Sequence, residues 1–181
     1  FYNNFLGFSL YILEIYYNAS TIHNMSDQIE YIDIVDRDNN IIGTSTAKEA
    51  HEQKLLHRVV GVLLFDIHGN LFFQSGTKYN LLDLSVGGHV MKDESYIDAA
   101  KREMSEELNL ETELQHISIF YPEDQARFGH FWLIYEAIMP ESWEFKPTLE
   151  VPDLIKMEYK DVLLKINESP ELFTKGFLNV F

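Results

Sequence analysis

The pattern of apolar and polar positions predicts a hairpin at the start of the well-patterned part of the chain. Residues 31–35 are β-branched and aromatic, residues 36–40 offer turn chemistry, and Ile41 and Ile42 resume the apolar run. This alternation is typical of two antiparallel strands joined by a tight connection. Ser45 or Thr46 is then expected to cap a short helix that runs through Leu56.

Further along the chain, strand patterns alternate with helical ones. A continuous apolar run at 59–65, a turn at 68–70 and a second run at 71–73 predict another hairpin with a deeply buried first strand. Short strands are also expected at 83–86, 114–121 and 131–139. Pro170 follows Ser169 as at a helix start, so a helix should close the domain. We predict an α+β fold, an α/β/α sandwich with a mixed sheet.

The clearest helix is predicted at 95–108. Ile97, Ala100, Met104 and Leu108 recur at helical spacing and form one apolar stripe, because each residue of a helix advances by about 100°. This stripe is expected to pack on the sheet.

Composition limits the classes of function. With 181 residues, of which 46% are hydrophobic, the chain can bury one sizeable core. Its formal charge of -15 would repel nucleic acid polymers and anionic membranes, so neither is an expected partner. The sequence contains no cysteine, which excludes disulfides, thiolate zinc sites and cysteine nucleophiles and suits a reducing compartment such as the cytoplasm.

The first 24 residues differ from the rest. Residues 1–17 are apolar and aromatic, but they include Glu14, lack a basic leading region and are too few to span a bilayer, so we expect neither a signal peptide nor a membrane helix. The first methionine is Met25. We treat residues 1–24 as an appendage to a domain at 25–181; a short amphipathic helix over an apolar patch is an equal alternative.

Three glutamates on the predicted helix carry the candidate chemistry. Glu103, Glu106 and Glu107 are spaced so that their carboxylates lie on one side, at the edge of the apolar stripe. Such like charges repel unless a cation neutralises them, and Mg²⁺ or Mn²⁺ suits both carboxylates and phosphates. Gly87 and Gly88, expected in a loop, would allow close approach of backbone atoms. Taken alone, a glutamate-rich helix face is more often a solvated surface.

The spacing from these glycines to the glutamates resembles the Nudix box, Gx5Ex7REUxEExGU, where U is a bulky aliphatic residue. The residues of segment 88–110 that match are Gly88, Glu94, Arg102, Glu103, Met104, Glu106, Glu107 and Leu110. Asn109 replaces the family's glycine at the helix end, where asparagine is the next-best residue for a left-handed backbone. From about Glu30 to Tyr159 the wider pattern is similar to the Nudix branch related to isopentenyl-diphosphate isomerase.

The resemblance implies a hydrolase that cleaves a small organic diphosphate, nucleoside-diphosphate-like or other, with Mg²⁺ or Mn²⁺. Glu103 and Glu107 would be the main metal ligands, Glu106 a further one and the Gly88 carbonyl an additional candidate, while Arg102 would orient the glutamates. Glu103 is the first candidate for the base that activates water, and a carboxylate elsewhere is the alternative. A homodimer is compatible with this resemblance.

Other residues have weaker claims to the substrate. Gly87, His89, Arg58 and Lys78 are candidate substrate contacts, although for His89 a local packing role is favoured and for Arg58, its neighbour His57 and Lys78 the two interpretations balance. Glu94 is expected to stabilise the start of the helix. Glu150 is a candidate extra base or ligand, with a surface loop favoured. The segment 75–83 departs from relatives and affects substrate recognition, not metal chemistry.

Two rival functions remain. Related isomerases use a cysteine where this chain has Gly87, so the absence of cysteine argues against isopentenyl-diphosphate isomerisation. A non-catalytic binding or regulatory domain is the second rival, because a fold does not fix a function. The complete glutamate set argues against it.

Overall fold

The computed structural model describes residues 29–75, 81–120, 130–148 and 150–180. The chain divides into two compact units, residues 1–30 and 31–181. The predicted appendage at 1–24 lies outside the described residues, and so does Lys78. The fold described below is therefore that of the second unit.

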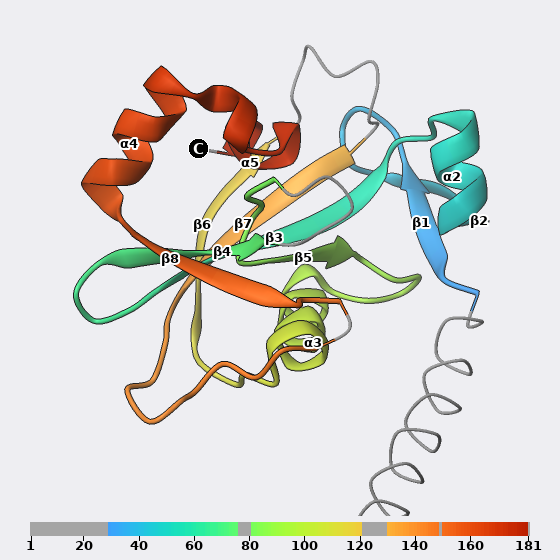
Figure 1. Ribbon diagram of the computed structural model, residues 1–181. Helices are drawn as coiled ribbons and strands as arrows, with labels where there is room; N and C mark the ends of the chain where they lie inside the picture. Colours follow the sequence, from blue (N-terminus) through green and yellow to red (C-terminus); the bar gives the residue numbers. More distant parts are fainter. Residues whose placement is uncertain (1–28, 76–80, 121–129, 149, 181) are drawn as a thin grey trace, which may run out of the picture. The chain divides into compact units, whose positions relative to one another are not determined.

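Eight strands and four α-helices are described in the second unit (Figure 1). In chain order they are β1 (Tyr31–Val35), β2 (Ile41–Thr46), α2 (Ala47–Gln53), β3 (His57–Phe65), β4 (Asn70–Ser75), β5 (Val86–His89), α3 (Tyr96–Leu108), β6 (Leu114–Phe120), β7 (His130–Ile138), β8 (Asp153–Glu158), α4 (Tyr159–Glu168), the short 3-10 helix η1 (Pro170–Leu172) and α5 (Lys175–Val180).

The central strand β3 organises the sheet. It pairs in parallel with β7 along its whole length, while on its other edge it meets β1 at His57, β5 at residues 59–62 and β4 at Phe65, all antiparallel. β4 continues away from β3 as a long antiparallel pair with β8. Three strands thus share this edge of β3, and β5 pairs with it between the contacts of β1 and β4.

The two faces of the sheet bury separate cores. Val60, Val62 and Leu64 pack with the apolar stripe of α3, whereas Leu63 and Ile134 pack with Val162 of α4 and Phe177 of α5. Figure 1 shows α3 on one side of the strands and α4 and α5 on the other. The predicted mixed sheet between helices is confirmed.

The local caps explain where the first helices begin and end. Thr46, and not Ser45, caps α2 through a reciprocal pair of hydrogen bonds with Glu49. The predicted end at Leu56 is wrong, because Lys54 takes a left-handed backbone with φ 56° and ends the helix at Gln53. In α3 the cap is Ser95, which was not predicted, whereas Asn109 is left-handed with φ 49°, as the sequence predicted.

Three other expectations need correction. The short strand lies at Val86–His89 and not at 83–86, so Gly87 and Gly88 belong to a strand that pairs with β3 and not to a loop. Pro170 begins only one turn of 3-10 helix, and the closing helix α5 starts at Lys175. β8 and α4 were not predicted. No helix among the described residues is long and apolar enough to cross a membrane.

Candidate active site

Two of the three predicted glutamates are buried where α3 meets β5. Glu103 and Glu107 are each 8% exposed, whereas the side chain of Glu106 is 45% exposed. One helical turn separates the two buried carboxyl groups along α3, at the edge of the apolar stripe. They are therefore held next to the sheet and not in bulk solvent.

Arg102 links the acidic side chains. Its Nη1 donates to Glu103 Oε1 at 2.8 Å and to Glu106 Oε2 at 3.1 Å, and its Nε and Nη2 bind both oxygens of Glu94. Nη2 also donates to the carbonyl oxygen of His89 at 2.9 Å. The predicted role of Glu94 at the helix start changes accordingly: Ser95 caps α3, and Glu94 holds Arg102 in place.

The two glycines of β5 differ in what surrounds them. A Cβ added at Gly88 would overlap the carboxylate of Glu103, whereas one added at Gly87 would make an ordinary contact with the carbonyl of Val60, 3.6 Å away. The backbone N–H of Gly87 donates to Glu107 Oε2 at 3.3 Å. Gly88 therefore makes room for the carboxylate of Glu103 against the strand.

A glutamine that sequence reasoning overlooked contacts the site from β4. Gln74 Nε2 donates to Glu107 Oε2 at 2.6 Å and to the carbonyl oxygen of Ser85 at 3.1 Å. The contact spans 33 residues of sequence, so no local pattern announces it.

Burial and the charges of neighbouring carboxylates make these carboxyl groups resist ionisation. Burial raises the pKa of Glu103 to about 7, although Arg102 opposes the shift, and burial together with the charge of Glu103 raises the pKa of Glu107 to about 8. A divalent cation would offset both effects, and carboxylate oxygens are the donors that Mg²⁺ and Mn²⁺ prefer. The donor set fits such a cation.

The loop before β8 brings a further carboxylate toward the pair. Thr148 Oγ1 donates to the carbonyl oxygen of Glu107 at 3.1 Å and accepts from Val151 N at 2.9 Å, which ties this loop to the end of α3. The charge of Glu150 raises the pKa of both Glu103 and Glu107. Glu150 is exposed, as a surface loop predicts, but it acts on the site electrostatically.

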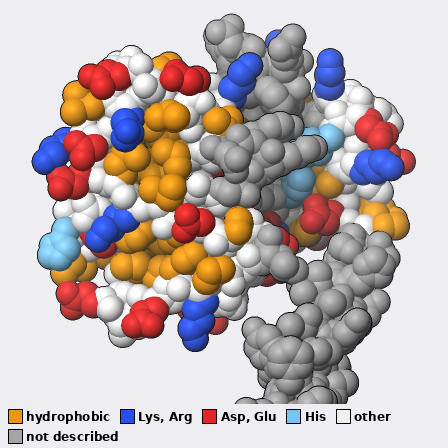
Figure 2. All heavy atoms as spheres, in the orientation of Figure 1, with side chains coloured by type: hydrophobic (Ala, Val, Ile, Leu, Met, Phe, Trp, Pro, Cys, Tyr) orange, Lys and Arg blue, Asp and Glu red, His pale blue; other side chains and the backbone are white. Residues whose placement is uncertain are grey.

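Histidines gather on the sheet face opposite α3. Ligand nitrogens of His51, His57 and His89 lie within 4.8 Å of one another, and the ring centroids of His57 and His130 are 4.4 Å apart. Figure 2 shows histidine side chains beside acidic ones at the right of the view. Of these residues His51 and His130 were not singled out from the sequence, because their spacing of 79 positions gives no local pattern.

The geometry of this histidine cluster suits a metal that prefers imidazole. His57 Nδ1 lies 2.7 Å from the carbonyl oxygen of Leu55, which places the ring proton there and leaves Nε2 with a lone pair. In the described part of the chain that buried Nε2 has no hydrogen-bond partner. Burial lowers the pKa of His57 to about 4 and that of His130 to about 3, so both rings are neutral at pH 7.

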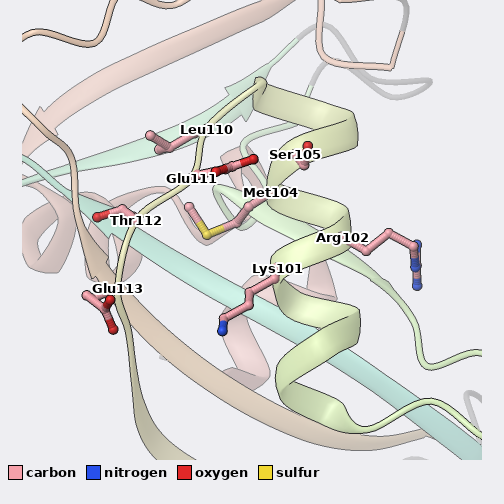
Figure 3. Close-up of a pocket in the computed structure, with 8 residues that line it drawn as sticks. All are labelled: Lys101, Arg102, Met104, Ser105, Leu110, Glu111, Thr112 and Glu113. Carbon is pink, nitrogen blue, oxygen red and sulfur yellow. The ribbon is translucent and has the colours of Figure 1, made fainter.

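A cavity of about 200 Å³ opens beside the carboxylates. The residues that line it are Gln74, Asp83, Leu84, Gly87, Gly88 and Trp132. A larger hollow of about 640 Å³ lies between α3 and the segment that follows it, and Figure 3 shows Lys101 and Met104 directed toward it while Arg102 points away. The smaller cavity shares Gly87, Gly88 and Gln74 with the carboxylate site, so it is the one placed for a substrate.

The predicted substrate contacts lie at different places in the structure. Gly87 lines the cavity, and His89 lies in the histidine cluster, where its Nε2 is 2.9 Å from that of His51. Arg58 is on the α3 face of the sheet, where it binds Asn39 and lies over the ring of Tyr96 with 5.4 Å to the centroid. Lys78 is outside the described residues.

Comparison with known proteins places this geometry in a family. The model of the NUDIX domain matches residues 55–168, which include the strands β3 to β8, the glycines of β5 and the glutamates of α3. The chain belongs to the Nudix family. Members of this family that are hydrolases generally cleave pyrophosphate bonds with the help of divalent metals.

Relatives of this Nudix chain include both hydrolases and isomerases. It is 31% identical to an isopentenyl-diphosphate Delta-isomerase of Serratia proteamaculans over 83% of this chain and 89% of that protein. It is 35% identical to an uncharacterised Nudix hydrolase of Nostoc over 73% of this chain and 80% of that one. The crystal structure of DR0079 from Deinococcus radiodurans superposes with a TM-score of 0.64 at 25% identity, covering 77% of this chain and 90% of that one.

Proposed function

We propose that this protein is a hydrolase that uses Mg²⁺ or Mn²⁺ to cleave the diphosphate linkage of a small organic substrate. One observation supports it most: the buried carboxylates of Glu103 and Glu107 lie against β5, where Gly88 leaves room for Glu103 and the Gly87 N–H binds Glu107. Among the residues that the structure describes, only Glu103 of these two buried carboxylates has a cationic partner, Arg102, so a bound divalent cation would offset the cost of ionising them.

In this proposal the two glutamates are the main ligands, and Glu106 and the Gly88 carbonyl complete the set. Cations held there would supply positive charge to the diphosphate, which is the chemistry that such ions provide in phosphoryl transfer. Arg102 keeps Glu103 and Glu106 in place through its hydrogen bonds and is itself held by Glu94. The nearby cavity then receives the organic group next to the linkage.

The base that accepts the proton of the attacking water is a carboxylate of this cluster. Glu103 is the first candidate, because its pKa near 7 lies close to the working pH of a general base. Glu150 is the alternative, since its charge acts on both buried glutamates from an exposed loop that a water molecule can reach.

The test is turnover of a panel of diphosphates with Mg²⁺ or Mn²⁺: nucleoside diphosphate sugars, dinucleotides, nucleoside triphosphates and prenyl diphosphates. We expect hydrolysis of at least one compound and a loss of about 100-fold or more in Glu107→Gln, since a direct ligand matters at least as much as its supporting residues. Glu141→Gln, a change at an exposed turn, is the control. Binding of the same compounds without turnover would instead support a non-catalytic diphosphate-binding domain.

A second candidate function is isomerisation of an isopentenyl-diphosphate-like substrate. It is favoured by the isomerase relative and by the histidine cluster on the β5 face next to Gly87. The chain has glycine at the position where related isomerases have their cysteine, and it contains no cysteine. Incubating the protein with isopentenyl diphosphate separates the candidates, because an isomerase forms an isomeric diphosphate and a hydrolase releases phosphate or pyrophosphate.

A further inference from the structure

Gln74 connects the candidate metal site to the sheet. The residue is 8% exposed, and its Nε2 donates to Glu107 at 2.6 Å and to the carbonyl oxygen of Ser85 at 3.1 Å. Ser85 is itself fully buried: its Oγ donates to the carbonyl oxygen of Phe72 at 2.5 Å and accepts from Leu64 N at 2.8 Å. The amide of Gln74 is thus anchored to β3 and β4 before it reaches the glutamate.

This network determines the orientation of the amide. Both partners of Nε2 are acceptors, the carbonyl of Ser85 and the carboxylate of Glu107, so only the NH₂ end of Gln74 can occupy that place. Both amide hydrogens are used. Gln74 also lines the smaller cavity together with Gly87.

The hydrogen bonds to Glu107 are unevenly shared between its two oxygens. Gln74 and the backbone N–H of Gly87 both donate to Oε2. Within the described part of the chain, Oε1 takes no hydrogen bond. A carboxylate held by one oxygen keeps the other available for a cation in a defined direction.

The chemical type of the residue also matters. A lysine or arginine at this place would neutralise Glu107 and compete with a cation. A glutamine donates hydrogen bonds but leaves the negative charge of the carboxylate intact. The amide is therefore suited to fix a metal ligand without replacing the metal.

We propose that Gln74 is a positioning residue that holds Glu107 Oε2 so that Oε1 faces the divalent cation. This inference rests on the proposed function, because it requires a cation at the glutamates. A purely structural role of the same hydrogen bond would lower the stability of the fold but leave the affinity of the folded protein for metal unchanged.

The experiment measures Mn²⁺ binding to the full chain by titration calorimetry, with thermal unfolding in EDTA recorded for every variant. Gln74→Met has a similar length but no donor, and Gln74→Asn keeps the amide but is too short to reach both partners. Gln115→Met, at an exposed position on β6, is the matched control. We expect both Gln74 variants to bind Mn²⁺ about 10-fold to 100-fold more weakly than the wild type, the range found when residues that support metal ligands are removed.

The outcomes distinguish a failure of the positioning role from a failure of the proposed function. Weakened Mn²⁺ binding in both Gln74 variants that remain folded, with Gln115→Met unchanged, supports the positioning role. If the wild type binds Mn²⁺ and both Gln74 variants bind within two-fold of it, the positioning role is wrong and the proposed function stands. If neither the wild type nor Gln115→Met binds Mn²⁺, the proposed function fails and the inference fails with it.

Discussion

Ionisation of the buried carboxyl group of Glu107 lowers the stability of the metal-free fold. Burial and the neighbouring Glu103 raise the pKa of its carboxyl group from 4.5 to about 8. Between these two pH values the metal-free folded state keeps a proton that the unfolded chain has released. The folded state is therefore stabilised below about pH 4.5, and this contribution is lost as the pH rises toward 8.

Replacing Glu107 with glutamine should remove this contribution. In EDTA, we expect the melting temperature of Glu107→Gln minus that of the wild type to increase from pH 5 to pH 8, reaching on the order of 5 °C. The reason is that the amide avoids the cost of ionising a buried group. Scanning calorimetry at several pH values measures the difference. A difference that stays constant across this range would contradict the shifted pKa.

For single residues, the predictions from the sequence were correct where they depended on spacing within one helix. The placement of Glu103 and Glu107 on one helix face and the left-handed Asn109 were predictable, because each depends on positions within one helix. The partners of Glu94 and Gln74 were not predicted, since they lie 8 and 33 residues away in the sequence and meet only in the fold. The histidine cluster was missed for the same reason: β7 brings His130 beside His57 only through parallel pairing.

Among the elements, β5 was predicted in the wrong place, and the reason is informative. Two successive glycines are typical of a loop, but here they pair with Gly61 and Val60 of β3. Gly88 is required because the carboxylate of Glu103, on α3, occupies the place of a side chain there. The strand propensities of the residues in β5 give no information about this contact with another element. β8 and α4 were also missed; most of their residues are half-buried or exposed, and Val162 is the buried residue of α4.

The strand β5 offers a matched pair of substitutions. Gly88→Ala should displace the carboxylate of Glu103 and reduce Mn²⁺ affinity by about 10-fold or more, because ligands must keep their geometry to bind well. Gly87→Ala introduces the same methyl group one residue away, where it meets only the Val60 carbonyl at 3.6 Å, so its Mn²⁺ affinity should be nearly that of the wild type. Calorimetric titration compares the two. Equal affinities would show that the contact between Gly88 and Glu103 does not govern the site.

For the molecule as a whole, charge and site must be considered together. A formal charge of -15 disfavours approach of any polyanionic substrate. Within the described residues that line the cavity there is no lysine or arginine, and Arg58 is engaged with Asn39 on the other face of the sheet. A cation at the glutamates would therefore supply positive charge that the cavity lining itself lacks.

This balance predicts how the protein responds to magnesium. Mg²⁺ at one hundred times its dissociation constant should stabilise the fold by about 2.7 kcal/mol, which corresponds to a rise in melting temperature of about 5–10 °C for a domain of this size. Any salt also screens the repulsion among the excess acidic groups, so NaCl at matched ionic strength is the necessary control. Specific binding requires that MgCl₂ exceed NaCl in the wild type and that the excess disappear in Glu107→Gln. If both salts raise the melting temperature equally, Mg²⁺ acts on the surface charge alone and the glutamates hold no cation.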